Sequence, residues 1–256
     1  MSWVDHMISF VFKNLKERKR KSIKVSGQKT SYEASAAYTL LSDVVMRTGN
    51  GSIYYNVIGS NEAVDPIAQK DYFDKAHYLI QVDLKSMEAT PIGTYSDFYK
   101  NNYGKIRHMI ETYYDLDLNG NFYISHQADS VIYLYDKEFS LISQFGFQGR
   151  DMDTDYSDPS STEDKFSVAY VKDRKEKGYY YAVKYVDELG LLFRSYKKGS
   201  RAMTDGLQIY ENNILVADLD VPANFRVAGY IAPYLITEVI ADENSKSVMF
   251  YRFRIN

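Results

Sequence analysis

The sequence predicts an all-β protein, a β-propeller built of four-stranded meander blades, and two observations lead to this fold class. Apolar residues alternate with polar ones over short runs along the 256 residues, and hardly any stretch keeps a helical period for three turns. Landmarks in the first part of the chain also recur at a spacing of 53 residues. We expect the six-bladed type. Five blades or an incomplete sixth are the alternatives, because six units of that length exceed the chain.

Each predicted strand is a short run rich in β-branched and aromatic residues, and turn residues separate one run from the next. In chain order the predicted strands are 52–57, 78–84, 122–125, 131–136, 140–145, 166–171, 179–185, 191–196, 207–210, 214–218, 234–240 and 247–255. Many short strands at regular intervals are typical of a sandwich, a barrel or a propeller.

The repeat favours the propeller among these three architectures. Asp83 and Asp136 each end an apolar run, and they lie 53 residues apart; Gly93 and Gly146 have the same spacing. Later, degenerate units are predicted to start at Lys177-Gly178 and at Asn212-Asn213 with a shifted phase. Blades that pack face to face need bulky side chains on both faces, which gives the 25 tyrosines a structural role.

We expect the propeller domain to span residues 35–256, preceded by N-terminal strands and a basic turn in residues 1–34. Residues 13–21 carry six of the 31 basic side chains and one acidic side chain. A solvated turn between two elements is the expected role of this run, and a membrane-surface or nucleic-acid patch is the alternative. The remainder of the chain is acidic, so we expect no nucleic-acid partner.

Residues 119–149 resemble a blade of the NHL and TolB-like six-bladed propellers. The similarity lies in the Asn-Gly-Asn turn, the Phe-Tyr-Ile strand, the Tyr-Asp strand end and the Phe-Gly-x-x-Gly exit. From about residue 35 onward the chain is similar to uncharacterised TolB-like proteins of gut anaerobes, including at residues 233–236 and 249–253. The resemblance implies a periplasmic or cell-surface protein, and it implies no activity.

Two features of the chain differ from what this resemblance implies. There is no signal peptide and no apolar stretch long enough to span a membrane, so the chain as written is expected to be soluble and cytoplasmic. The chain is also short for six blades. We therefore expect an N-terminally shortened member of the group.

Several catalytic classes have no support in the sequence. There is no cysteine, no Gly-x-Ser-x-Gly and no phosphate-binding glycine motif, and the single tryptophan excludes the sialidase and WD repeats. His6, His77, His108 and His126 have no partner at metal-ligand spacing, so we expect structural or surface roles for them.

One acidic cluster is a candidate Ca²⁺ site. The candidate ligands are Asp151, Asp153, Asp155 and Asp158. The first three alternate as at the start of a calcium loop, but Tyr156 occupies the place of the required glycine. An acidic loop between blades is the competing interpretation. We expect no other metal and no cofactor.

Glu111, Asp115 and Asp117 are the weak candidate catalytic residues. Their two-residue period places them on one face of a predicted innermost strand, near the axis of a propeller. Paired carboxylates there would suit a glycoside hydrolase or lyase. A polar lining of a water-filled channel is the competing interpretation.

From these observations we expect a non-enzymatic binding or protein-interaction module of the cell envelope. Its ligand, a protein, a peptide or a glycan, would bind at the mouth of the central channel, where loops from several blades meet. The alternative is the carbohydrate-active enzyme just described. We also expect a monomer.

Overall fold

The computed structural model describes residues 8–14, 19–25, 37–40, 45–60, 70–157, 163–242 and 247–255. The chain divides into two compact units, Met1–Ser96 and Asp97–Asn256. The division predicted at residues 34 and 35 stays a prediction.

The first unit contains a strand pair and a sheet. The strands of the pair, β1 (Ile8–Asn14) and β2 (Lys19–Val25), are antiparallel. Residues 13–14 and 19–21 of the basic run belong to these two strands, and residues 15–18 lie outside the described residues. The sheet contains β3 (Ala37–Leu40), β4 (Met46–Gly49), β5 (Ser52–Ser60), β6 (His77–Asp83) and β7 (Ala89–Thr94), with the short helix α1 (Tyr72–Lys75) between β5 and β6.

In this sheet the long strand β5 pairs with both β3 and β4 along one edge. β4 pairs with its first half and β3 with its second half. The fully buried Asn56 lies at the junction, where its Oδ1 accepts a hydrogen bond from the backbone N–H of Val45 at 2.8 Å. One core cluster consists of Ile53, Tyr55, Val57, Ile80 and Val82.

The second unit starts with two short helices, α2 (Asp97–Asn101) and α3 (Tyr103–Ile106). A meander sheet follows in the order β11-β10-β9-β8, from β8 (Thr112–Leu116), β9 (Phe122–His126), β10 (Ile132–Tyr135) and β11 (Leu141–Phe145). The next meander contains β12 (Tyr179–Val186), β13 (Leu191–Lys197), β14 (Asp205–Glu211) and β15 (Ile214–Val221).

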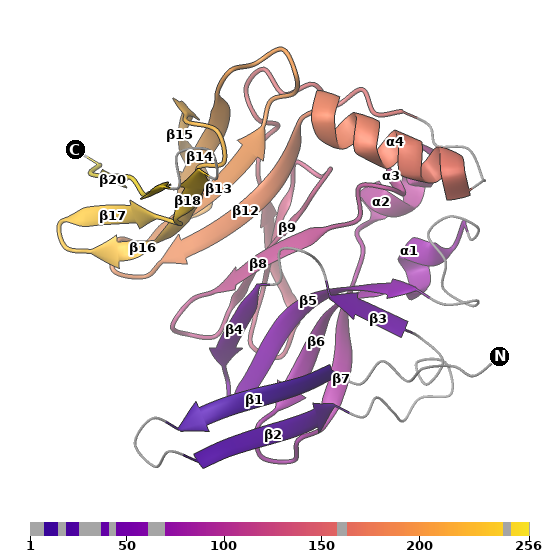
Figure 1. Cartoon of the computed structure of the whole chain (residues 1–256), viewed down its shortest axis with the longest axis vertical. Helices are drawn as coiled ribbons and strands as arrows, with labels where there is room; N and C mark the ends of the chain where they lie inside the picture. The colour runs from indigo at the N-terminus through magenta and orange to yellow at the C-terminus, as the bar shows by residue number, and fades with distance from the viewer. Residues whose placement is uncertain are drawn as a thin grey trace. The chain divides into compact units, whose positions relative to one another are not determined.

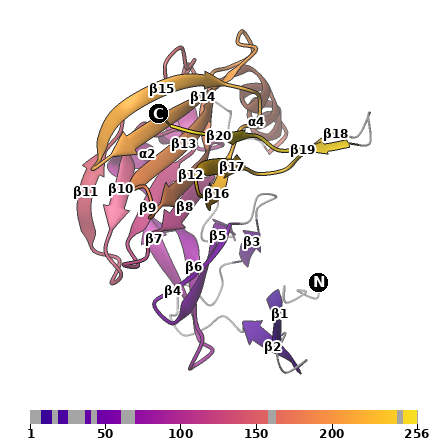
Figure 2. The same ribbon diagram turned by 90° about the vertical axis from the view of Figure 1, so that its left-hand side faces the viewer.

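The last part of the second unit contains a smaller sheet. Its three strands are β16 (Val227–Ile231), β17 (Tyr234–Thr237) and β20 (Arg252–Phe253), and the hairpin of β18 (Ile240–Asp242) and β19 (Ser247–Met249) lies between β17 and β20 in the chain. The first strands of the three sheets are neighbours, since β12 contacts both β8 and β16. The meander sheets follow one another through the unit (Figures 1 and 2), an arrangement typical of propeller blades.

A buried arginine joins two of these sheets. Arg194 on β13 is fully buried, and its guanidinium lies 3.8 Å from the centre of the Tyr180 ring. Within its own sheet it donates to Gln208 Oε1, and Nη2 donates to the backbone carbonyls of Ser130 and Phe147 at 2.9 and 2.8 Å. Ser130 and Phe147 flank β10 and β11, so one cation holds the two meander sheets together.

The 53-residue repeat has a structural basis in two equivalent hairpins. Asp83 Oδ1 accepts from the backbone N–H groups of Lys85 and Ser86 at 2.9 and 2.6 Å. Asp136 Oδ1 likewise accepts from Glu138 and Ser140 at 3.0 and 2.7 Å. Each aspartate therefore shapes the turn between the third and fourth strands of its meander.

The glycine landmarks are also equivalent. Gly93 and Gly146 both have positive φ, 77° and 131°, and lie near the end of the strand that follows the hairpin. The two later units predicted at Lys177-Gly178 and Asn212-Asn213 occupy other places. Lys177-Gly178 precedes β12, the first strand of its sheet, and Asn212-Asn213 forms the turn between β14 and β15.

One predicted strand is wrong: residues 166–171 belong to the helix α4 (Glu163–Glu176), which is labelled in Figure 1. The buried Ala169 and Asp173 are four residues apart and share one helical face, whereas Val168 and Val171 are 67% and 64% exposed. The basic last turn of α4, with Arg174 and Lys175, suits the helix dipole. The runs 234–240 and 247–255 are each divided into two strands.

Candidate functional site

The first candidate carboxylate, Asp115, is fully buried on β8 and is already paired. Its Oδ2 lies 2.7 Å from Lys184 Nζ and accepts the backbone N–H of Tyr185 at 2.9 Å, both on β12. The Asp115 side chain is therefore directed at the neighbouring strand, where it holds β8 to β12.

Glu111, just before β8, is held by three side chains. Its oxygens accept from Tyr113 at 2.5 Å and Tyr170 at 3.1 Å, and Arg174 Nη1 lies 2.9 Å away. Burial and the Glu111 charge raise the pKa of Tyr113 well above its ordinary value. Burial alone would lower the pKa of Arg174, but Glu111 raises it above its ordinary value. The group therefore fixes α4 to β8 as a charged, hydrogen-bonded cluster.

Asp117 follows β8 and shapes the turn into β9. Its two oxygens accept the backbone N–H and the side-chain amide of Asn121 at 2.9 and 2.8 Å. The three predicted carboxylates thus have three separate sets of partners. No described contact links any two of them directly, and their catalytic role stays a prediction.

A buried network that the sequence did not reveal lies on α4. Asp173 is fully buried; its Oδ2 lies 2.8 Å from His108 Nε2, and its two oxygens also accept from the backbone N–H and the hydroxyl of Ser157 at 2.7 and 2.8 Å. The carboxylate lies between the histidine and the serine, so the order differs from that of a catalytic triad, in which the histidine is central. The network ties residue 157 to α4 and to the segment after α3. It was missed because residues 166–171 were predicted as a strand.

Two other histidines have backbone or side-chain partners in the described part of the chain. His77 Nδ1 lies 3.1 Å from the Gly93 carbonyl oxygen, and His126 Nδ1 lies 2.8 Å from Thr112 Oγ1. Burial lowers the pKa of His126 to about 4. His6 lies outside the described residues.

Two aspartates of the candidate calcium site lie near lysine side chains of the same chain. Asp153 accepts from Lys177 Nζ at 3.1 Å, and Asp151 lies 3.9 Å from Lys198 Nζ. Burial would raise the pKa of Asp153, but the Asp155 amide and Lys177 lower it below its ordinary value. Asp158 lies outside the described residues. Among those described, no three acidic or histidine side chains form a group that could hold a metal, and Ca²⁺ binding stays a prediction.

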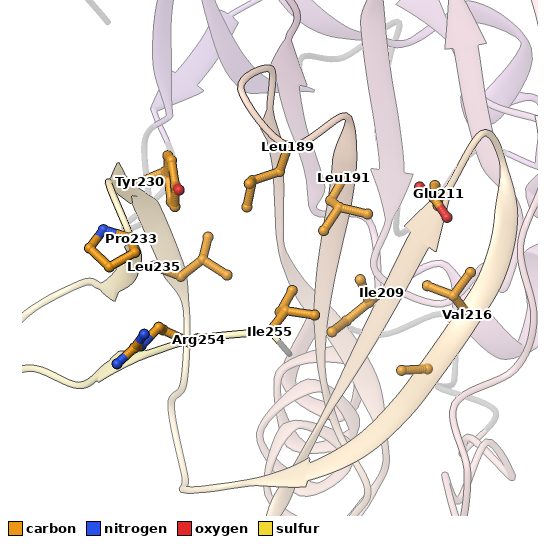
Figure 3. Close-up of a pocket in the computed structure, with 11 residues that line it drawn as sticks. Leu189, Leu191, Ile209, Glu211, Val216, Tyr230, Pro233, Leu235, Arg254 and Ile255 are labelled. Carbon is orange, nitrogen blue, oxygen red and sulfur yellow. The ribbon is translucent and has the colours of Figure 1, made fainter.

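One pocket lies between the sheet β12–β15 and the sheet β16-β17-β20, with a volume of about 520 Å³. Figure 3 shows its apolar lining, with Arg254 and Glu211 as its charged residues. The apolar residues are Leu189, Leu191, Ile209, Val216, Ala217, Tyr230, Pro233, Leu235 and Ile255. They come from three hairpins, β12–β13, β14–β15 and β16–β17, and from the segment after β20.

A second pocket of about 280 Å³ lies on the other face of the same sheet. Tyr123, Leu134, Tyr185, Tyr210 and the turn residues Asn212 and Asn213 are among its lining residues. The rings of Tyr123 and Tyr185 are stacked there with their centres 4.6 Å apart. Both pockets thus lie at the end of the sheet where β14 turns into β15, and sequence analysis predicted neither.

Comparison with known proteins gives a structural neighbour. The chain is similar to the crystal structure of a member of the DUF4221 family from Bacteroides vulgatus, with a TM-score of 0.62 and 11% sequence identity over 91% of this chain and 69% of that one. A protein from Lactobacillus plantarum matches with a TM-score of 0.33 and 12% identity over 96% of this chain and 64% of that one. That score is too low to carry an argument.

No protein-family model matches the chain, and no curated protein matches its sequence. The likeness to the DUF4221 structure concerns the fold alone. With the meander sheets of both units, it confirms the predicted fold class, an all-β fold of propeller type. No helix among the described residues is both long and apolar enough to cross a membrane.

Proposed function

We propose that the chain is a non-enzymatic binding module of propeller type, and that its ligand inserts an apolar group into the pocket of Figure 3. The pocket carries the proposal. Its volume of about 520 Å³ lies within the range of small-molecule and side-chain sites, and its lining is apolar with two charged residues, Glu211 and Arg254.

The kinship with TolB-like and NHL-like propellers is part of the proposal, as is a location in the cell envelope. Both rest on the resemblance of residues 119–149 and of the C-terminal residues. A hydrolase or lyase acting through Glu111, Asp115 or Asp117 has no supporting observation. Asp115 and Glu111 are engaged by Lys184 and Arg174, and Asp117 is engaged by Asn121.

The test uses an apolar dye and a substitution that fills the pocket. Ala217 lines the pocket, whereas Ala202 is exposed in the loop after β13. We expect anilinonaphthalene sulfonate to bind the wild-type chain and the Ala202→Trp control equally. Ala217→Trp should weaken binding about tenfold, because the indole occupies the space the dye needs. Equal dye binding by all three proteins would contradict a ligand site in this pocket.

A further inference from the structure

The two faces of the sheet β12–β15 are covered differently. On one face the neighbouring sheet contributes four strands, and the cover extends to the last strand, β15. The Phe145 ring on β11 lies 5.4 Å from the Tyr210 ring, and Arg150, just after β11, donates to Asp218 and Asp220 on β15 at 3.2 and 2.7 Å.

On the other face, the neighbouring sheet contributes three strands among the described residues, and β20 contains two residues. The core there is well packed near β13 and β14, where Phe193, Leu207 and Ile209 meet Phe225 and Leu235. Further out, the described residues cover this face less completely. Val216 and Leu219 on β15 are 52% and 47% exposed, and the pocket lies beside them. The exposed part of β15 on this face thus corresponds to the part that β11 and the segment after it cover on the opposite face.

β20 has one unused edge among the described residues. It pairs with β17 alone, with Phe253 opposite Leu235 and Arg252 opposite Ile236. The Tyr251 carbonyl oxygen accepts from Thr237, so the backbone of Tyr251 faces β17. Along a strand, the backbone N–H and C=O groups of successive residues point to opposite edges. The backbone groups of Arg252 and Arg254 therefore point away from β17.

Side chains on this edge alternate between two environments. Phe253 packs on the apolar core and Ile255 lines the pocket. The guanidinium groups of Arg252 and Arg254 both lie over the Tyr234 ring, 4.7 and 5.1 Å from its centre, and both arginines are exposed. Arg254 also borders the pocket, so one of the two cations lies at its rim. A strand added here would place every second side chain toward the pocket and the others beside two cations.

We propose that this edge binds an extended segment of a partner protein, which adds to β20 as a fourth strand. Its aliphatic side chains enter the pocket of Figure 3, and its acidic side chains alternate with them and face Arg252 and Arg254. Backbone hydrogen bonds supply affinity, and the alternation supplies specificity. This inference rests on the proposed function and names its ligand class.

The test measures the fluorescence anisotropy of three labelled peptides. The probe is Glu-Val-Glu-Ile-Glu-Val-Glu; the controls are Lys-Val-Lys-Ile-Lys-Val-Lys and Glu-Val-Glu-Pro-Glu-Val-Glu. We expect the probe to bind at least about tenfold more tightly than either control, because lysine reverses the charge and proline removes a backbone donor.

Variants locate the binding to this edge. The double variant Arg252→Glu with Arg254→Glu should reverse the preference in favour of the lysine peptide. Ala217→Trp should weaken probe binding about tenfold, and Ala202→Trp should leave it unchanged. Thermal melting of each variant shows whether it is folded, and the charge reversal gives a gain of binding that misfolding cannot produce.

Several outcomes would overturn the inference. Equal binding of all three peptides would show that the site has no preference for an alternating acidic strand. An unchanged preference in the double variant would show that the peptide does not bind at this edge. Concentration-dependent self-association that the double variant abolishes would assign the edge to a second copy of this chain. If the dye binds in the pocket but no peptide binds, the inference fails and the proposed function stands; if neither binds, both fail.

Discussion

Lys184 Nζ lies 2.7 Å from Asp115 Oδ2, and this ion pair joins β12 to β8. The Asp115 side chain is fully buried, whereas that of Lys184 is 24% exposed. Asp115 also accepts a backbone hydrogen bond from Tyr185. A carboxylate that sequence analysis placed near a catalytic cleft thus connects the first strands of two sheets.

Replacing this carboxylate should weaken the fold. For Asp115→Asn we expect the free energy of unfolding to fall by about 2 kcal/mol, because Lys184 loses its partner while the amide can still accept from Tyr185. Urea denaturation measures the change, and Asp151→Asn, whose side chain is 74% exposed, is the control. If Asp115→Asn left stability unchanged but abolished a glycan-cleaving activity, the enzyme alternative would be supported instead.

His126 should make the protein less stable in acid. Burial lowers its pKa from 6.5 to about 4, so on acidification the unfolded chain takes up the proton before the folded chain does. The free energy of unfolding should therefore decrease as the pH falls from 6.5 toward 4, by about 1.4 kcal/mol per pH unit. In a His126→Asn variant this part of the slope should be absent. An NMR titration of the His126 ring with a midpoint near 6.5 would refute the prediction.

Three glycines with positive φ should respond differently to alanine. Around Gly51 an added Cβ meets open space, so Gly51→Ala should cost only the backbone strain, about 1 kcal/mol. At Gly146 the Cβ would collide with the Ser130 carbonyl oxygen, and at Gly93 with the Tyr78 ring. We expect Gly146→Ala and Gly93→Ala to cost about 2–3 kcal/mol each in chemical denaturation. Equal losses at all three positions would mean that the close contacts have no effect.

Calcium should have little effect on this chain. Asp153 is paired with Lys177, and Asp151 lies near Lys198. Ca²⁺ would therefore have to displace the ammonium groups of these lysines. We expect no heat in a calorimetric titration with Ca²⁺ and an unchanged melting temperature in EDTA. Ca²⁺-dependent heat that is lost in Asp153→Asn would establish the calcium site.

Much of the fold was predictable because a meander leaves local signals. Alternating runs and turn residues located most strands of the two meanders in the second unit, and the spacing of Asp83 and Asp136 marked two equivalent hairpins. The helix α4 was not predicted, since residues 166–171 are rich in aromatic and β-branched side chains, as a strand would be. Its helical signal lies in Ala169 and Asp173, whose burial depends on distant partners.

The site was less predictable because its contacts span long stretches of chain. Lys184 is 69 residues from Asp115, and Arg174 is 63 residues from Glu111. No local pattern specifies such pairs. The pocket likewise forms where three hairpins and the segment after β20 meet, and only the structure brings Leu189, Val216 and Pro233 together.

The position of Arg194 also bears on how the second unit unfolds. Its guanidinium is fully buried and depends on carbonyl oxygens of Ser130 and Phe147 in the adjacent sheet. If one meander opened while the other stayed folded, the guanidinium would lose the hydrogen bonds to Ser130 and Phe147. Water would not replace all of them, because the rest of the group would stay buried. Partial opening is therefore costly, and the amides of β9 and β13 should exchange with solvent deuterium through one shared cooperative transition.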